Sequence, residues 1–550
     1  MRSVPLTLLI ALVTAPSAAG QVELGLQGQP YFGGDATLTV EDVGLANVSQ
    51  PVILALGLNP LPLDAPVPTG KGPWYVGTLV NTALVGTIPV DGDFRLDFTM
   101  PPETPAPVGI PIVLEAYVGG QFTNPATVPL DEPYYEPAAA VVLAAASPQQ
   151  LSYFGDRNAV GDFNADGHPD IVAGAWWQDV GGAVKAGAVH VFWGPSFDTV
   201  TVLTSPTPAA THYFGLDLAV ADVDGDMVDD LVVGEGGGSP APVGAYGHLY
   251  VFRGAASFSQ VPAASIQGLT SEPAVGLFGR QIHAGDLDGD GAVDLIAGLP
   301  NSSFNGISNE GHVEVFYGPQ YDRGVIVSSP DPEANDFFGS RVSCADVTGD
   351  GIADLLEASG REDAGGVVNV GRAHVFDGPT LQPILTLENP LPDGSNSRFG
   401  NAILGADADG DGLAEIVVTD ERDHAFVFRS PDYATYTLIH RPPPPGGPGS
   451  TCASFGYYMA AGDANGDGVL DIVIAEPYGE RVHVALGPYW QTVRTVMDQV
   501  PKSGAEFGWG VTMADVNEDG CDDLIVGSDL ADVGSTSGGG HITVFGNAPR

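Results

Sequence analysis

A Phe-Gly pair recurs seven times in this sequence at intervals of 60, 64, 60, 61, 56 and 52 residues, and this repeat constrains the fold more than any other feature. The phenylalanines of these pairs are Phe154, Phe214, Phe278, Phe338, Phe399, Phe455 and Phe507. An apolar step, an Asp-rich loop and three further strand-like runs follow each pair, as in 294–298, 311–318 and 325–328. Four short strands per unit, repeated seven times around a ring, predict a seven-bladed β-propeller.

Composition supports an all-β fold. Glycine and proline supply 75 and 46 of the 550 residues, about 22 % against an average of roughly 12 %. Such frequent backbone interruption, with Val, Ile, Phe and Tyr in short runs, excludes a helical protein. A linear β-solenoid is the alternative, but solenoid repeats are usually much shorter.

The ends of the repeat region predict how the ring closes. The last repeat reaches 541–545 and then has too few residues for a fourth strand. The apolar stretch 138–146 lies before the first Phe-Gly pair and has the character of a fourth strand. We therefore expect the propeller to span 138–550, with 138–146 pairing into the seventh blade and removing two exposed sheet edges.

The first 137 residues lack the repeat. Residues 1–20 combine Arg2, an apolar stretch and a series of small residues, which is typical of a cleaved signal peptide. Residues 21–137 show alternating strand-like runs separated by Pro/Gly loops, which predicts a small β-sandwich. No stretch in the sequence has the ~18–20 apolar residues of a membrane span. We therefore expect a secreted protein that could still associate with the cell surface.

Seven nine-residue segments, here called the acidic loops, follow the Phe-Gly pairs. All have oxygen-bearing side chains at positions one, three, five and nine, and six have glycine at position six. These residues are Asp162, Asn164, Asp166 and Asp170; Asp222, Asp224, Asp226 and Asp230; Asp286, Asp288, Asp290 and Asp294; Asp346, Thr348, Asp350 and Asp354; Asp407, Asp409, Asp411 and Glu415; Asp463, Asn465, Asp467 and Asp471; and Asp515, Asn517, Asp519 and Asp523.

Oxygen donors at alternate positions of a tight loop converge on a hard cation, and calcium prefers six to eight such ligands. We therefore predict up to seven Ca²⁺ ions, which would reduce the formal charge from −49 to −35. Magnesium fits less well because it keeps several waters and demands stricter octahedral geometry. Met227 replaces the glycine of the second loop, and Thr348 offers a neutral oxygen in the fourth, so these two loops should bind most weakly.

The Phe-Gly pair, the acidic loop and the apolar-Gly step that follows together resemble the FG-GAP repeat of the integrin α propeller. The resemblance covers about 138–550. The "Gly-Ala-Pro" element is only partly kept, at 174–176 and 298–300, and 418–420 and 475–477 depart further. This resemblance implies the propeller fold, calcium binding and extracellular recognition or adhesion. It does not identify the ligand, since the fold also carries polysaccharide lyases and phospholipases.

No catalytic motif accompanies the repeats. Trp176 and Trp177 offer either a stacking platform for a sugar ring or packing between blades. Cys452 and Cys521 could form one disulfide. One histidine per blade lies at or in the third strand, where we expect a structural role: His190, His248, His312, His374, His424, His483 and His541.

Three functions remain open on the sequence alone. The leading hypothesis is a non-catalytic recognition or adhesion module for an extracellular glycan or protein, with its binding residues on the variable loops opposite the acidic loops. The second is an extracellular polysaccharide lyase or hydrolase. The third is a structural component of the cell envelope. The strong negative charge disfavours nucleic acid as a partner.

Overall fold

The computed structural model describes nine strands within the first 128 residues and then residues 140–237, 247–270, 278–391, 396–421, 423–442, 454–490, 492–498 and 504–546. The chain divides into two compact units, Met1–Tyr134 and Tyr135–Arg550. No helix in the described ranges is long and apolar enough to cross a membrane.

The first unit contains two sheets. One has the order β5-β4-β1-β7-β8 with β9 paired to β7, and the other has the order β2-β3-β6. The strands are β1 (Thr7–Leu12), β2 (Gln21–Gln27), β3 (Asp35–Val43), β4 (Pro51–Gly57), β5 (Thr82–Thr87), β6 (Phe94–Thr99), β7 (Ile112–Val118), β8 (Gln121–Phe122) and β9 (Ala126–Val128). Strand β1 lies within the segment expected to be a signal peptide. Cleavage of that segment, and sandwich packing of the two sheets, both stay predictions.

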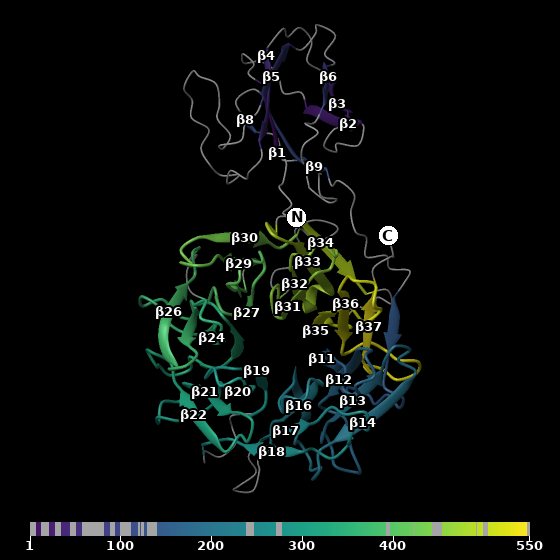
Figure 1. Ribbon diagram of the computed structural model, residues 1–550, viewed down its shortest axis with the longest axis vertical. Helices are drawn as coiled ribbons and strands as arrows, with labels where there is room; N and C mark the ends of the chain where they lie inside the picture. Colours follow the sequence, from purple (N-terminus) through teal and green to yellow (C-terminus); the bar gives the residue numbers. More distant parts are fainter. Residues whose placement is uncertain are drawn as a thin grey trace. The chain divides into compact units, whose positions relative to one another are not determined.

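The second unit consists of seven four-stranded antiparallel sheets, which confirms the predicted seven-bladed propeller (Figure 1). The first four blades are β11 (Phe154–Gly161), β12 (Asp170–Ala175), β13 (Ala188–Trp193) and β14 (Thr199–Thr204); β15 (Phe214–Ala221), β16 (Asp230–Glu235), β17 (His248–Phe252) and β18 (Ala264–Gln267); β19 (Gln281–Gly285), β20 (Asp294–Leu299), β21 (His312–Tyr317) and β22 (Arg323–Val327); and β23 (Arg341–Ala345), β24 (Asp354–Ser359), β25 (Arg372–Asp377) and β26 (Gln382–Glu388).

The last three blades complete the ring. They are β27 (Ile403–Ala406), β28 (Glu415–Thr419), β29 (His424–Phe428) and β30 (Tyr436–His440); β31 (Met459–Gly462), β32 (Asp471–Glu476), β33 (Arg481–Leu486) and β34 (Thr492–Met497); and β35 (Phe507–Ala514), β36 (Asp523–Ser528) and β37 (His541–Phe545) with β10 (Val141–Leu143). A short 3₁₀ helix, Pro477–Gly479, follows β32.

Two contacts close the propeller. Strand β10 pairs antiparallel with β37, with Val142 opposite Thr543, so the seventh sheet combines both ends of this unit. The first strands of successive blades pack on one another around the ring, and β35 packs against β11 (Figure 1). The seventh sheet therefore gains a fourth strand from the segment that precedes the first blade.

The Phe-Gly pair joins each blade to the previous one. The phenylalanine is buried in every blade, and in six blades its ring packs near-perpendicular to a phenylalanine of the third strand, as with Phe154 and Phe192. The glycine that follows has positive φ, for example +86° at Gly155. A Cβ on Gly527 of the preceding blade would lie 1.9 Å from the carbonyl oxygen of Gly155. Both glycines are therefore required where the two blades approach each other.

Candidate functional site

The acidic loops all lie on one rim of the propeller, here called the acidic rim. Each connects the first strand of its blade to the second, as 286–294 connects β19 to β20. The residue at position nine opens the second strand in every blade and is fully buried, whereas position five is exposed in most blades. The structure thus places all 28 predicted ligands on this rim, grouped by blade.

The carboxylate at position one shapes the loop. In the third blade, Asp286 Oδ1 accepts a hydrogen bond from the N–H of Gly289 at 2.8 Å, and Oδ2 accepts one from the N–H of Gly291 at 2.9 Å. The bond to the N–H of position six recurs in all seven loops. Each carboxylate oxygen has two lone pairs, so these bonds leave acceptor capacity for a cation.

The carboxylate at position nine links two segments of its blade. Asp294 Oδ2 accepts the N–H of Leu287 at 2.9 Å, and Oδ1 accepts the N–H of Gly318, directly after β21, at 2.8 Å. The same pair of bonds occurs at Asp170, Asp230, Asp354 and Asp471. Sequence reasoning identified this position only as a metal ligand, because the second partner lies 24 residues away in the chain.

These buried carboxylates carry raised pKa values. The pKa of Asp294 is raised to about 6, mainly by burial and in part by Asp288 and Asp286, while its backbone hydrogen bonds oppose the increase. Burial raises the pKa of Asp170 and Asp230 to about 6 as well, and that of Asp471 to about 8. Several acids thus surround a buried charge that nearby cations would stabilise.

In three of the acidic loops, the carboxylates are close enough together to hold one cation in each loop. Carboxylate oxygens within each group lie within 4.8 Å of one another, and the groups are Asp222, Asp224 and Asp230; Asp286, Asp288 and Asp290; and Asp407, Asp409 and Glu415. Calcium–oxygen distances of about 2.3–2.6 Å place two ligands of one ion up to about 5 Å apart. In the second loop, Asp224 Oδ1 is buried and accepts no hydrogen bond within the described residues. These acidic groups could therefore hold a metal ion.

These three are the loops with an acid at position three, and an arginine approaches that acid in each. Arg253 lies 3.0 Å from Asp224, Arg323 lies 3.9 Å from Asp288, and Arg429 approaches Asp409 to 4.0 Å. The arginines come from the outer strands and their ends, so no local motif revealed them. Arg253 and Arg323 are more than half exposed, so these ion pairs contribute little stability.

Position six of the second loop is strained as expected. Met227 has φ +68° and a 92 % exposed side chain, whereas the glycines at this position in the other loops have φ between +80° and +93°. The loop still makes the N–H bond to Asp222 at 2.8 Å. The methionine therefore adopts the glycine conformation with a side chain too exposed among the described residues for packing to offset the strain.

Position eight was missed by the sequence reasoning. Asp229 Oδ2 accepts the N–H of Asp162 at 2.9 Å, and Asp522 Oδ2 accepts the N–H of Asp463 at 2.7 Å. Each bond joins the acidic loop of one blade to that of the preceding blade. An acid at this position therefore connects neighbouring blades.

The opposite edge, here called the FG rim, contains the starts of the first strands and the ends of the second strands. Two aromatic groups lie there. Tyr153 stacks on Trp176 with ring centroids 5.0 Å apart, next to Trp177 and Tyr213. In the sixth and seventh blades, the ring centroids of Trp509 and Tyr457 lie 4.8 Å apart, and Tyr458 and Tyr478 flank Trp509.

The tryptophans expected at this rim pack against protein neighbours. Lys185 Nζ lies 3.3 Å from the ring centroid of Trp177, and the Trp176 Nε1–H donates to Asp156. Both rings remain partly exposed. Packing between blades, the second of the two interpretations, is present at Trp176, which contacts Tyr213 at the start of the second blade, and sugar stacking stays a prediction.

Six of the seven histidines bond a side chain of their own blade, and His541 forms an ion pair with Asp498, directly after the last strand of the sixth blade. His374 Nε2 lies 2.8 Å from Glu362 and His483 Nε2 lies 2.8 Å from Glu476, whereas His190 Nε2 faces the amide oxygen of Gln178. The other four contact Gln267, Glu314, Asp420 and Asp498. The possible disulfide involves Cys452, which lies outside the described residues, so that pairing stays a prediction.

Models of known repeat families match three stretches of this chain. A model of FG-GAP-like repeats matches residues 397–474, and the FG-GAP repeat model matches residues 154–192 and 507–545. Integrin alpha-5 of Xenopus laevis is 30 % identical over 233 residues, which cover 38 % of this chain and 20 % of that protein. Human integrin alpha-IIb is 28 % identical over 242 residues, which cover 42 % of this chain and 22 % of that protein.

A second kind of relative also matches. Phosphatidylinositol-glycan-specific phospholipase D of Dictyostelium discoideum is 25 % identical over 260 residues, 41 % of this chain and 27 % of that protein. The aligned part of this chain thus spans about a fifth to just over a quarter of these relatives. The matches confirm the repeat type that the Phe-Gly pairs predicted.

Proposed function

We propose that this seven-bladed propeller of FG-GAP repeats is a secreted, calcium-stabilised module that recognises or adheres to a surface glycan or protein without catalysis. One observation carries the proposal: its two rims differ in chemistry. Carboxylates repeat in every blade at the acidic rim, whereas the FG rim carries aromatic, basic and acidic side chains that differ from blade to blade. Variable groups on a rigid ring are the usual site of recognition.

The acidic rim is the proposed calcium rim. Up to seven ions would be held by the side-chain oxygens at positions one, three, five and nine of the loops. Bound calcium supplies positive charge where several carboxylates crowd around a buried one. The chain's own part is to preform each loop, through the position-one and position-nine hydrogen bonds. Ordering of the loops would then hold the FG rim in one arrangement.

The FG rim is the proposed binding surface. Partly exposed tyrosine and tryptophan rings offer stacking area with hydrogen-bonding groups at their edges, which suits sugars and protein surfaces alike. The integrin relatives support a recognition or adhesion role. Secretion rests on the predicted signal peptide of residues 1–20, and the formal charge of −49 disfavours nucleic acid.

A second candidate, a glycan hydrolase or lyase, is favoured by one group on the same rim. Asp529 is 1 % exposed, and burial, Asp156 and Glu506 raise its pKa well above the usual range. Burial also raises the pKa of Glu506. A carboxyl group whose pKa is raised by burial and neighbouring acids can act as a general acid.

The test is binding of the full chain to an array of glycans and matrix proteins, in calcium and again in EDTA. Calcium-dependent retention on a narrow set of ligands is the expected result. Retained glycans are then incubated with the protein and analysed by mass spectrometry. Cleavage products that disappear in an Asp529→Asn variant would replace the binding module with the enzyme. No retention under either condition would overturn the recognition role.

A further inference from the structure

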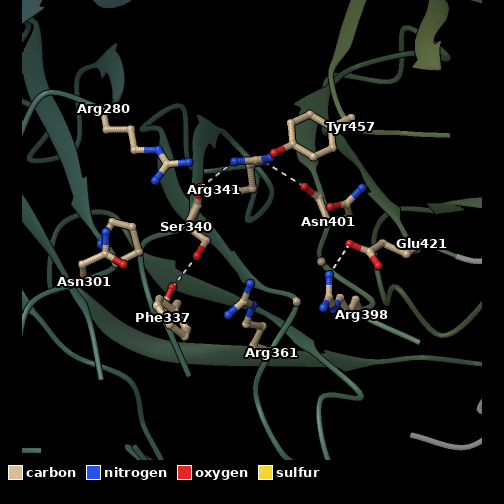
Figure 2. A pocket seen from close by; sticks show the side chains of 13 residues that line it. Arg280, Asn301, Phe337, Ser340, Arg341, Arg361, Arg398, Asn401, Glu421 and Tyr457 are labelled. Atoms are coloured by element: carbon tan, nitrogen blue, oxygen red, sulfur yellow. Dashed lines mark hydrogen bonds and ion pairs between the residues drawn. The ribbon is translucent and has the colours of Figure 1, made fainter. Parts of the chain in front are cut away.

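A cavity of about 210 Å³ lies on the FG rim between the third, fourth and fifth blades (Figure 2). Four arginines and one acid line it, and we call it the arginine pocket: Arg280, Arg341, Arg361, Arg398 and Glu421. Figure 2 shows the guanidinium groups of Arg280, Arg341 and Arg361 directed toward the same space. Arg280 and Arg341 lie at the starts of first strands, Arg361 follows a second strand, and Arg398 directly precedes the Phe-Gly pair of the fifth blade. Three blades therefore supply the arginines.

The charge of the pocket is opposite to that of the chain. The whole protein has 19 lysines and arginines against 68 acids, yet four arginines and a single carboxylate meet here. Glu421 pairs with Arg398 at 2.6 Å. Within the described residues, the guanidinium groups of Arg280, Arg341 and Arg361 form no ion pair. In the part of the chain that the structure describes, three cations thus face one cavity without an ion-pair partner.

Neutral groups hold two of the pocket arginines, Arg341 and Arg361, in position. Arg341 donates to the carbonyl oxygens of Asn401 at 2.8 Å and Ser340 at 3.1 Å, and lies 5.0 Å from the Tyr457 ring centroid. Arg361 lies 4.7 Å from the Phe337 ring centroid. These contacts orient a guanidinium group without neutralising it.

The arginine of the first blade that corresponds to Arg341 is neutralised by acids. Arg157, like Arg341, stands two residues after the Phe-Gly glycine, and it pairs with Asp156 at 2.9 Å and Asp217 at 3.0 Å. An arginine at the same repeat position is therefore paired with acids in the first blade and, among the described residues, has no ion pair in the fourth. We take this difference as evidence that the fourth blade's arginine faces a ligand.

We propose that the arginine pocket binds the acidic group of one sugar unit in an anionic polysaccharide, an inference that rests on the proposed recognition function. Guanidinium groups bind carboxylate and similar oxyanions through paired hydrogen bonds. The volume is below the roughly 300–1,000 Å³ of pockets that enclose a drug-sized ligand, so one charged unit fits. Tyr457 connects the pocket to Tyr458 and Trp509, where adjoining sugar rings would stack.

The experiment measures binding of the full chain, in calcium, to hyaluronan, chondroitin sulfate, neutral dextran and poly-glutamate. Hyaluronan offers carboxylates alone, and chondroitin sulfate adds sulfates, so the preferred probe identifies the acidic group. Wild type should bind one of these two, more weakly as salt increases, and should not bind dextran. The Arg280→Gln/Arg361→Gln double variant should lose at least tenfold in affinity without a change in melting temperature.

Two control variants separate charge from geometry. Arg323→Gln removes one exposed charge at the acidic rim and should bind like wild type. Arg361→Lys keeps the charge but not the planar fork, and should lose affinity by a smaller factor than the double variant. Equal losses in Arg323→Gln and the double variant would show a non-specific charge effect and overturn the pocket assignment.

The remaining outcomes distinguish this inference from the proposed function. Binding to neutral glycans alone, or anionic binding that the double variant retains, would overturn the arginine pocket and leave the recognition module standing. Pocket-dependent binding of poly-glutamate in preference to both glycans would overturn the sugar assignment in favour of an acidic peptide. No binding to any probe, together with an empty array, would overturn both.

Discussion

At the acidic rim one hydrogen bond, from the N–H of position six to the position-one carboxylate, recurs in all seven blades. At the FG rim, the residue after the Phe-Gly pair differs in every blade. These seven residues are Asp156, Leu216, Arg280, Ser340, Asn401, Tyr457 and Trp509. The same repeat thus fixes the carboxylate that shapes the acidic loop and leaves the residue after the Phe-Gly pair free to vary.

The difference has a physical cause. An acidic-loop residue accepts backbone hydrogen bonds, so a change of residue type affects the turn itself. The close approach between two backbones constrains the Phe-Gly glycine but not the residue after it. The side chain of that next residue is oriented only by its neighbours. We therefore expect changes at the acidic rim to affect stability and changes at the FG rim to affect binding.

Removal of calcium should give the largest decrease in stability, and it tests whether the acidic rim stabilises the fold. With a Kd of about 0.1 mM at about 1 mM calcium, each site would contribute about 1.4 kcal/mol, or roughly 10 kcal/mol for seven sites. Calorimetry in calcium, magnesium and EDTA should show the highest melting temperature in calcium and a large decrease in EDTA. Added NaCl serves as the control for screening of the −49 charge. Equal melting temperatures in calcium and EDTA would contradict a calcium rim.

A pair of substitutions in the third loop separates folding from metal binding. Asp294→Ala leaves the buried N–H groups of Leu287 and Gly318 unpaired, so it should cost about 2–4 kcal/mol in calcium and in EDTA. Asp290→Asn changes an exposed residue and keeps an acceptor for the N–H of Ala292. It should cost about 1 kcal/mol in calcium only.

Urea unfolding of both variants with and without EDTA measures these costs. A cost of Asp294→Ala that disappears in EDTA would mean that position nine acts only as a metal ligand. A cost of Asp290→Asn that persists in EDTA would assign position five to the loop conformation instead.

The sequence predicted the features that repeat. Seven Phe-Gly pairs gave the blade number because a buried phenylalanine and a positive-φ glycine are needed wherever two blades meet. The acidic loops were recognisable because their ligands are close in sequence. Both features are local, so pattern alone could identify them.

The features that the sequence left unpredicted depend on distant residues. The second partner of Asp294 is Gly318, and the arginine beside Asp224 is Arg253, directly after the third strand of its blade. The arginine pocket collects its charged residues from the third, fourth and fifth blades and Tyr457 from the sixth. Its arginines become neighbours only when the ring forms, so no spacing rule could identify them.

The smallest predicted effect concerns the one acidic loop without glycine at position six. A left-handed backbone costs an L-residue about 1–2 kcal/mol, and glycine loses part of that gain through unfolded-state entropy. Met227→Gly should therefore raise the unfolding free energy in calcium by about 0.5–1 kcal/mol and tighten calcium binding at this loop by two- to fivefold. The reverse change, Gly291→Met in the third loop, should weaken its site by a similar factor. Titration calorimetry of both variants measures these shifts, and unchanged affinities in both would show that position six acts on folding alone, which would remove the reason to rank the second loop among the weakest.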